Sequence, residues 1–198
     1  MKDQAQPLLQ RAGIGDQGSG APGTKDQGPG TTPQPVVTVR TRIKPGDIGS
    51  VVRFHGVTYA REYGFDHTFE AYVAEPLGAF AKSAAPKKRL WIAEQGDRLV
   101  GCIAIVAHST DVAQLRWFLV DADCRGAGLG RRLLNKAVAF CRASGYRSVI
   151  LWTVSALTAA ARLYVSAGFR KVEDKPGTHW GVHVVEERYE LDLRSTPA

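Results

Sequence analysis

The segment Arg125-Gly126-Ala127-Gly128-Leu129-Gly130-Arg131-Arg132 has the composition of an anion-binding loop. Its glycines let the backbone turn tightly and come close to a ligand. A helix is expected to begin near residue 129, and the first turn of a helix has unpaired N–H groups and a partial positive charge. Both properties suit a diphosphate, and the arginines add cationic side chains nearby. The segment therefore predicts a phosphate-binding turn between a strand and a helix.

Other uses of such glycines are weakened by their spacing. A tight strand-to-helix turn without a ligand would need the same residues. A P-loop has Lys followed by Ser or Thr after its last glycine, whereas Arg131 and Arg132 stand here. A dinucleotide-binding fingerprint has Gly-x-Gly-x-x-Gly early in a βαβ unit. Here the glycines fall at alternate positions, after four expected strands and two expected helices.

A second motif downstream makes the pair more specific than either motif alone. Arg125-x-x-Gly128-x-Gly130, preceded by the expected strand 115–120, resembles the coenzyme A motif of the GNAT N-acetyltransferase superfamily. Ala160-x-x-Leu163-Tyr164-x-x-x-Gly168-Phe169 is similar to the second motif of that superfamily. The resemblance covers residues 36–193. In detail, His55-Gly-x-x-Tyr59-Ala-x-Glu62-Tyr63-Gly64 and Trp180-Gly181 resemble acetyltransferase domains often fused to MarR-type regulators.

The resemblance implies acetyl-CoA as co-substrate, with no metal. The strand before the loop would pair with the pantetheine arm and present a main-chain N–H to the thioester oxyanion. Tyr164 matches the tyrosine that faces the sulfur, and its hydroxyl would donate a hydrogen bond to the departing thiolate. Many members carry Asn where Leu157 stands, so either Ser155 substitutes for it or this contact to the cofactor arm is absent. The implied cofactor-binding residues are Phe118, Leu119, Val120, Arg125, Gly126, Ala127, Gly128, Leu129, Gly130, Arg131, Ser155 and Tyr164.

The general base is harder to assign. Many GNAT enzymes use a Glu on the strand before the glycine loop, but residues 115–120 contain no carboxylate. The remaining candidates lie where the superfamily places its acceptor pocket, and Glu70 is the first choice. For each candidate, the alternative to a catalytic role is a structural one: a solvated surface charge for a carboxylate, or a hydrogen-bonded side chain for a histidine. The other candidate bases are His55, Glu62, Asp66 and His179. The expected substrate-binding residues are His55, Tyr59 and Glu62. An apolar lining of the acceptor pocket is expected from Tyr59, Tyr63, Phe65 and Trp180.

These residues must be positioned by one α/β (α+β) domain, expected at residues 36–194. Hydrophobic periodicity predicts a strand, two helices, three strands, a helix, a strand, a helix and two strands. That order gives a mixed central sheet of about seven strands flanked by about four helices. The second helix, near residues 66–82, is expected to be interrupted by Pro76. Residues 1–35 are rich in Gly, Gln and Pro and predict a disordered tail.

Composition narrows the classes of function. The 198-residue chain has a net charge of +7, which suits an anionic partner, but no aromatic-rich basic motif supports nucleic acid binding. The sequence has no apolar run of about 18 residues, which a membrane-spanning helix would need, so a cytoplasmic protein is expected. The favoured function is transfer of an acetyl group from acetyl-CoA to an amine of a small molecule, peptide or protein. The alternative is a non-catalytic acyl-CoA sensor, and the resemblance also allows a homodimer.

Overall fold

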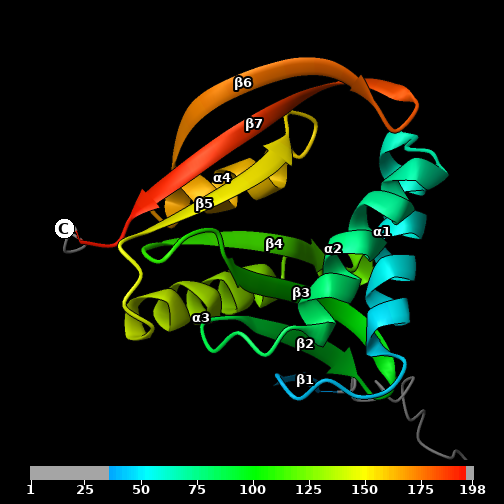
Figure 1. Ribbon diagram of the computed structural model, residues 1–198. Helices are drawn as coiled ribbons and strands as arrows, with labels where there is room; N and C mark the ends of the chain where they lie inside the picture. The colour runs from blue at the N-terminus through cyan, green and yellow to red at the C-terminus, as the bar shows by residue number, and fades with distance from the viewer. Residues whose placement is uncertain (1–35, 195–198) are drawn as a thin grey trace, which may run out of the picture. The chain divides into compact units, whose positions relative to one another are not determined.

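The computed structural model describes residues 36–194, and the tail expected at residues 1–35 lies outside these residues. Within them, seven strands form one sheet and four α-helices flank it, in the order that the sequence predicts (Figure 1). The elements are β1 (Val37–Arg40), α1 (Asp47–Tyr63), α2 (His67–Lys82), β2 (Arg89–Gln95), β3 (Arg98–Ala107), β4 (Val112–Val120), the short 3₁₀ helix η1 (Ala122–Cys124), α3 (Leu129–Ala143), β5 (Ser148–Val154), α4 (Thr158–Ser166), β6 (Arg170–His179) and β7 (Val182–Asp192).

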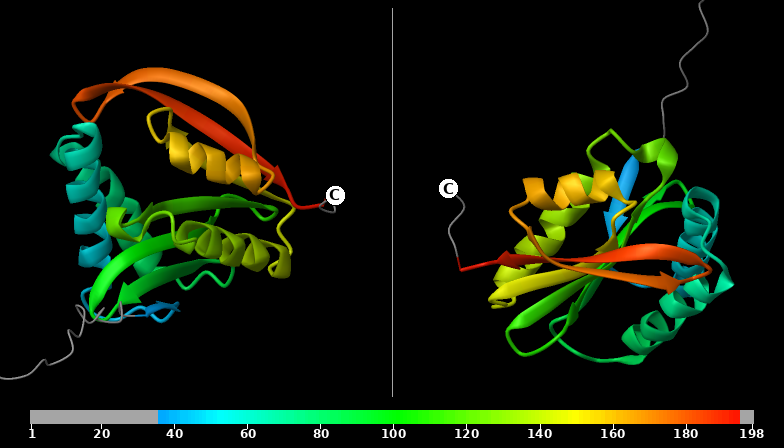
Figure 2. Two further views of the ribbon diagram at one scale, coloured as in Figure 1. Left: turned by 180° about the vertical axis from the view of Figure 1, so that it is seen from behind. Right: turned by 90° about the horizontal axis from the view of Figure 1, so that it is seen from above.

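The sheet has the order β1-β2-β3-β4-β5-β7-β6. Its neighbours are antiparallel except β4 and β5, which run parallel and are joined through α3. Helices cover both faces: α3 and α4 lie on one side, and α1 and α2 lie on the other (Figure 2). This mixed, two-sided arrangement is the fold class that the sequence predicts.

Each face of the sheet has its own hydrophobic core. On the α3 side, Leu133, Leu134 and Ala137 of α3 are fully buried against the strands. On the α1–α2 side, Val51 of α1 and Leu77 of α2 are fully buried. Burying such side chains contributes about 1.5–3 kcal/mol each, so both helix layers are held to the sheet chiefly by apolar contact.

Helix α2 is continuous, although Pro76 was expected to interrupt it. Proline has no N–H, so the helix gives up one backbone hydrogen bond at that point. The buried side chains of Phe69, Val73, Leu77 and Phe80 recur every three or four residues and continue past the proline. Packing of this stripe against the sheet outweighs the lost hydrogen bond.

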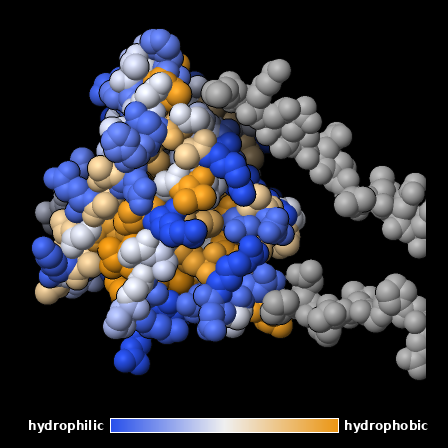
Figure 3. Space-filling model, turned by 90° about the vertical axis from the view of Figure 1, so that its right-hand side faces the viewer, coloured by the Kyte–Doolittle hydropathy of each residue, from blue (hydrophilic) through white to orange (hydrophobic). Residues whose placement is uncertain are grey.

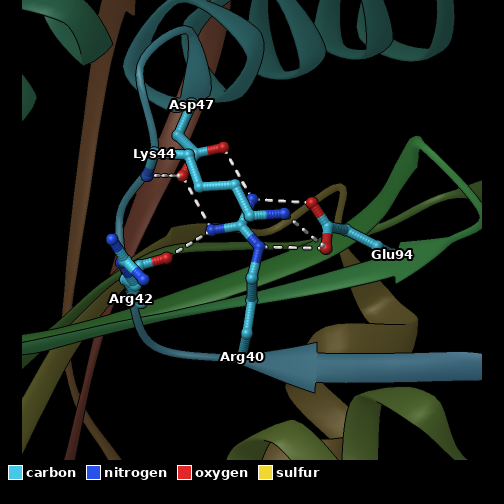
Figure 4. Close-up of polar contacts among 5 residues, drawn as sticks. All are labelled: Arg40, Arg42, Lys44, Asp47 and Glu94. Carbon is cyan, nitrogen blue, oxygen red and sulfur yellow. Dashed lines mark hydrogen bonds and ion pairs between the residues drawn. The ribbon is translucent and has the colours of Figure 1, made fainter.

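Arg40, at the end of β1, ties the start of α1 to β2 (Figure 4). Its guanidinium donates to both oxygens of Asp47 at 2.7 Å and to those of Glu94 at 2.6 and 2.9 Å. Burial acts to raise the pKa of Asp47, but the hydrogen bonds from Arg40 and the Lys44 amide leave it below its usual value. The bond from Arg40 likewise lowers the pKa of Glu94. Both carboxylates therefore stabilise the fold above their unfolded pKa values of about 4, and this stability is lost as the pH falls through the lowered folded values.

The side of the molecule where α1 lies is mixed in polarity: Figure 3 shows apolar patches between hydrophilic side chains. Scattered apolar surface of this kind is ordinary for a folded domain. None of the helices within residues 36–194 combines the length and the apolar character needed to cross a membrane.

Candidate active site

Strand β4 carries a β-bulge at its centre. Trp117 has a φ of +48°, and the pairing with β3 shifts so that Trp117 and Phe118 lie together opposite Ile103. A bulky residue in the left-handed region is strained, and such strain gathers at functional sites. A bulge also bends a strand and re-aims its side chains.

The bulge turns two consecutive side chains to the same face of the sheet. Arg116 lies over the ring of Tyr72 on α2, with 6.0 Å between its Cζ and the ring centroid. Trp117 packs edge-on against Phe80 of the same helix, with 5.5 Å between ring centroids. Strict alternation along a strand would have placed one of the two side chains on the α3 side.

Beyond the bulge, β4 and β5 separate. Their parallel pairing begins at Val112 and Ser148 and ends at Leu115 and Leu151, while β5 continues to Val154 along β7. Figure 1 shows the two strands diverging from this point. The edge of β4 that faces β5 is therefore unpaired over residues 116–120, and an extended ligand can add to it as a strand would.

A cavity of about 100 Å³ opens at this split and crosses the sheet from Tyr164 on α4 to Tyr72 on α2. Its lining comes from α1, α2, β4, β5, α4 and the β6–β7 hairpin. The lining residues are His55, Tyr59, Phe65, Phe69, Tyr72, Val73, Gln114, Leu115, Arg116, Trp117, Phe118, Trp152, Thr153, Val154, Leu157, Tyr164, Trp180 and Glu186.

One wall of the cavity is aromatic. The rings of Tyr59 and Phe69 lie 4.4 Å apart, and those of Phe65 and Trp180 lie 4.9 Å apart. Tyr72 completes the group, 5.2 Å from Trp180. The sequence predicted Tyr59, Tyr63, Phe65 and Trp180 as an apolar acceptor lining. The structure brings three of these together with Phe69 and Tyr72, whereas Tyr63 lies outside this cavity and lines a second hollow.

The glycine loop lies directly after β4. Gly126 and Gly128 have φ values of +79° and +80°, which glycine adopts without strain, and Gly128 is the N-cap of α3. Among the described residues, no side chain caps the first turn of α3, so the N–H groups of that turn are available to an anion. Gly130 is close-packed instead, since a Cβ there would lie 3.3 Å from Leu163 of α4. Ala127 and Arg131 of the same loop are exposed.

Arg125 and Glu62, for which the sequence predicted separate roles, form a bidentate ion pair. The guanidinium of Arg125 donates to the two carboxylate oxygens of Glu62 at 2.9 and 3.0 Å, and its Nε donates to the Val120 carbonyl at 3.1 Å. The hydrogen bond to Glu62 raises the pKa of Arg125. The pair links the glycine loop to α1 and holds the turn at the end of β4.

Tyr164 is buried at the α4 end of the cavity, with its ring 6.1 Å from that of Phe118. Burial, with smaller effects from Tyr59 and Tyr189, raises the pKa of the phenol well above its usual value of about 10. The hydroxyl therefore stays protonated throughout the neutral range. It can donate a hydrogen bond to an atom in the cavity, whereas full loss of its proton to a thiolate is uphill.

His55 lies in the floor of the cavity, with 3% of its surface exposed. Its Nδ1 lies 2.9 Å from the Val51 carbonyl, which can only accept, so Nδ1 carries the proton. Nε2 then holds a lone pair, and no described residue donates to it. Burial lowers the pKa of His55 to about 4. The ring is thus a neutral hydrogen-bond acceptor rather than a base that charges near pH 7.

The acidic residues fall into two groups. Glu70 is exposed on α2 beside Gly56, whose added Cβ would lie 3.0 Å from its Oε2, and Asp66 caps α2 by accepting from the Thr68 amide at 2.9 Å. Neither is part of the cavity lining. Glu186 of β7 does line the cavity, and one of its carboxylate oxygens lies 3.6 Å from Nε2 of His179.

The remaining predicted residues lie around the split. Phe118 and Val120 point toward the α3 side, and Leu119 points toward the α1–α2 side. Ser155 is exposed at the end of β5 and lines a second hollow with Tyr63, beside the β6–β7 hairpin. Within residues 36–194, no group of three or more His, Cys, Asp or Glu side chains could hold a metal ion.

Sequence reasoning missed Arg116, Trp152 and Glu186 in the lining. The only sequence signal for Glu186 was its place in the last expected strand. Alternation with Leu115 gives the face of Arg116, but its place in the cavity depends on α2 lying over that face, which the residues of β4 do not indicate.

Comparison with known proteins agrees with this geometry. The model of the acetyltransferase (GNAT) family matches residues 55–169. The N-acetylaspartate synthetase of Danio rerio is 32% identical over 52% of this chain, which spans only 34% of that relative's length. An uncharacterised N-acetyltransferase of Schizosaccharomyces pombe is 30% identical, covering 58% of this chain and 72% of its own.

Solved structures share the fold at low sequence identity. An N-acetyltransferase from Staphylococcus aureus superposes with a TM-score of 0.67 at 17% identity, covering 80% of this chain and 99% of its own. A Salmonella typhimurium protein solved with its cofactor acetyl-CoA has a TM-score of 0.66 at 17% identity, covering 82% and 96%. With the family model matching more than half of its length, this chain belongs to the acetyltransferase (GNAT) family.

Proposed function

We propose that the protein transfers the acetyl group of acetyl-CoA to an amine. The observation that carries this proposal is the unpaired edge of β4 over residues 116–120, which ends at an uncapped helix N-terminus and borders the cavity that holds Tyr164. Family membership supports it, as do the named N-acetyltransferases among the relatives.

The residues present fit acetyl-CoA. The open turn at Gly126 and Gly128 and the first-turn amides of α3, at Leu129, Gly130 and Arg131, would hold the diphosphate. A side chain at Gly126 or Gly128 would occupy open space and so stand where the ligand approaches. The free edge of β4 would pair with the amides of the pantetheine arm, as a strand pairs with its neighbour.

When bound, acetyl-CoA supplies a thioester that a neutral amine can attack. The N–H groups on the free edge of β4 are the donors that we assign to the carbonyl oxygen as it gains charge. The Tyr164 hydroxyl donates to the departing sulfur, and its raised pKa keeps it in the donating form. Alignment of amine and thioester in one cavity supplies much of the rate, since effective molarities can reach about 10⁵ M.

For the proton that the amine loses, we favour Glu186. It lines the cavity, whereas Glu70, the first choice from sequence, lies outside the lining and is exposed. Glu186 lies on β7 rather than on β4, which explains why β4 can lack a carboxylate without removing every acid from the cavity. This position weakens the case for a non-catalytic acyl-CoA sensor.

A thiol-release assay tests the proposal. Purified protein and acetyl-CoA are mixed with amines of several classes: L-aspartate, L-phenylalanine, 2-phenylethylamine, spermidine and a peptide with a free N-terminus. Amine-dependent release of free coenzyme A, with the acetylated product identified by mass spectrometry, is the expected result. Tight binding of acetyl-CoA with no turnover of any amine would favour the sensor instead.

A further inference from the structure

Arg116 is a cation in the cavity lining that lacks an acidic partner. Within residues 36–194, no carboxylate forms an ion pair with its guanidinium, whereas Arg40 and Arg125 are each held by bidentate pairs. The side chain is only partly exposed. A partly buried cation without a counter-ion is costly, so its presence in a binding cavity points to an anion on the ligand.

The geometry around Arg116 leaves its hydrogen-bonding edge free. The guanidinium carbon lies 6.0 Å from the centre of the Tyr72 ring and 5.2 Å from that of Trp117. Aromatic neighbours at this range stabilise the cation and restrict its orientation without using its N–H donors. The planar fork of an arginine matches the two oxygens of a carboxylate.

The rest of the cavity completes an amino-acid-shaped site. The aromatic wall of Tyr72, Phe69 and Trp180 offers apolar surface to a side chain. The carboxylate of Glu186 offers an acceptor for an amine N–H. A plain amine would use the wall and this acceptor but leave Arg116 without an anion.

We propose that Arg116 binds the carboxylate of the acceptor, which makes the acceptor an amino acid with an apolar or aromatic side chain. This inference rests on the acetyl transfer proposed above and specifies the substrate class for the same site. Alternation from Leu115, which faces α3, directs Arg116 toward α2, and the bulge adds Trp117 to the same face beside it.

Matched pairs of acceptors test the inference: L-phenylalanine with 2-phenylethylamine, and L-tryptophan with tryptamine, which differ only in the carboxylate. The thiol-release assay should give a kcat/KM about 10- to 100-fold higher for the amino acid of each pair, as expected for a charge-assisted contact. Calorimetric titration of both members into protein saturated with coenzyme A gives a second readout that does not need turnover.

Arg116→Gln should lower kcat/KM for the amino acids by the same factor and change kcat/KM for the amines far less, so that the preference within each pair is lost. Arg116→Lys should recover only part of the loss, because an ammonium cannot make the paired contacts. Arg142→Gln, at an exposed arginine in the last turn of α3, is the matched control and should behave as wild type.

Equal kcat/KM values within both pairs, or an unchanged preference in Arg116→Gln, would overturn the carboxylate site and leave acetyl transfer standing. Failure of every amine to release coenzyme A would overturn the proposed function. In that case, binding of L-phenylalanine but not 2-phenylethylamine, lost in Arg116→Gln, would still support the carboxylate site. Binding of neither would overturn both proposals.

Discussion

Gly128→Ala adds one carbon to the loop that we assign to the diphosphate of acetyl-CoA. Gly128 has a φ of +80°, and a Cβ there would meet no atom of residues 36–194 within 4 Å. The cost to the protein alone is therefore conformational, about 1–2 kcal/mol for an L-residue in the left-handed region. For a domain of this size, each kcal/mol corresponds to a fall in Tm of about 2–4 °C.

Gly145→Ala provides a matched control at the other end of the same helix. Gly145 has a φ of +74°, also with no protein atom within 4 Å of an added Cβ, and it follows the C-terminus of α3. The two variants should therefore lose similar stability in scanning calorimetry. They differ in that only Gly128 lies in the proposed binding loop.

The binding measurement separates the two variants. In Gly128→Ala the added Cβ stands in the open space where we expect the diphosphate to approach, whereas at residue 145 it lies away from the proposed binding loop. Kd for coenzyme A should therefore rise by about 10-fold or more in Gly128→Ala in isothermal titration calorimetry, which corresponds to about 1.4 kcal/mol, while Gly145→Ala should bind as wild type. Equal Kd values for the two variants, at equal loss of Tm, would refute the assignment of the diphosphate to this loop.

Three further substitutions test other parts of the site and fold. Tyr164→Phe should lower kcat about 10- to 100-fold with little change in KM, because a hydrogen bond to the leaving thiolate is lost; an unchanged kcat would remove this role. Glu186→Gln should lower kcat/KM by about 10²-fold or more, whereas Glu70→Gln, outside the cavity lining, should not; the reverse pattern would restore Glu70 as the base. Arg40→Met should lower the free energy of unfolding by about 2 kcal/mol at pH 7. Between about pH 5 and pH 3 the stability of this variant should fall less than that of wild type, because its Asp47 and Glu94 carboxylates lack the partner that lowers their pKa values. If the free energies of unfolding of wild type and Arg40→Met, measured by urea unfolding, fell equally across this pH range, the assigned role of Arg40 would be wrong.

Much of the fold could be predicted because its signals are local. The apolar stripe of α3, with Leu133, Ala137 and Cys141 buried, follows from helical periodicity within one segment. Gly64 and Gly128, which flank helices, follow from the conformational freedom of glycine. The glycine loop could be located from the same kind of evidence, since a turn and the helix that follows it depend on adjacent residues.

The missed features all depend on contacts between distant parts of the chain. Glu62 and Arg125 are 63 positions apart in sequence, so nothing local indicates that their charges pair. Pro76 was expected to break α2, but the sheet against which the helix packs decides otherwise. Arg116 lines the cavity because Tyr72 of α2 lies over its face of the sheet, and these two residues are far apart in sequence.

The strained bulge of β4 and the acceptor side of the cavity share one support. A positive φ at Trp117 persists only if the surroundings hold it, and two contacts do so. The Trp117 ring packs against Phe80 of α2, and its carbonyl accepts from Cys102 Sγ at 3.2 Å. Helix α2 also carries Tyr72, over which Arg116 lies. Because the same helix holds the bulge and faces the acceptor, the position of α2 connects the opening of the cofactor slot with the shape of the acceptor pocket. This explains why the buried stripe of α2 must continue through Pro76 rather than end there.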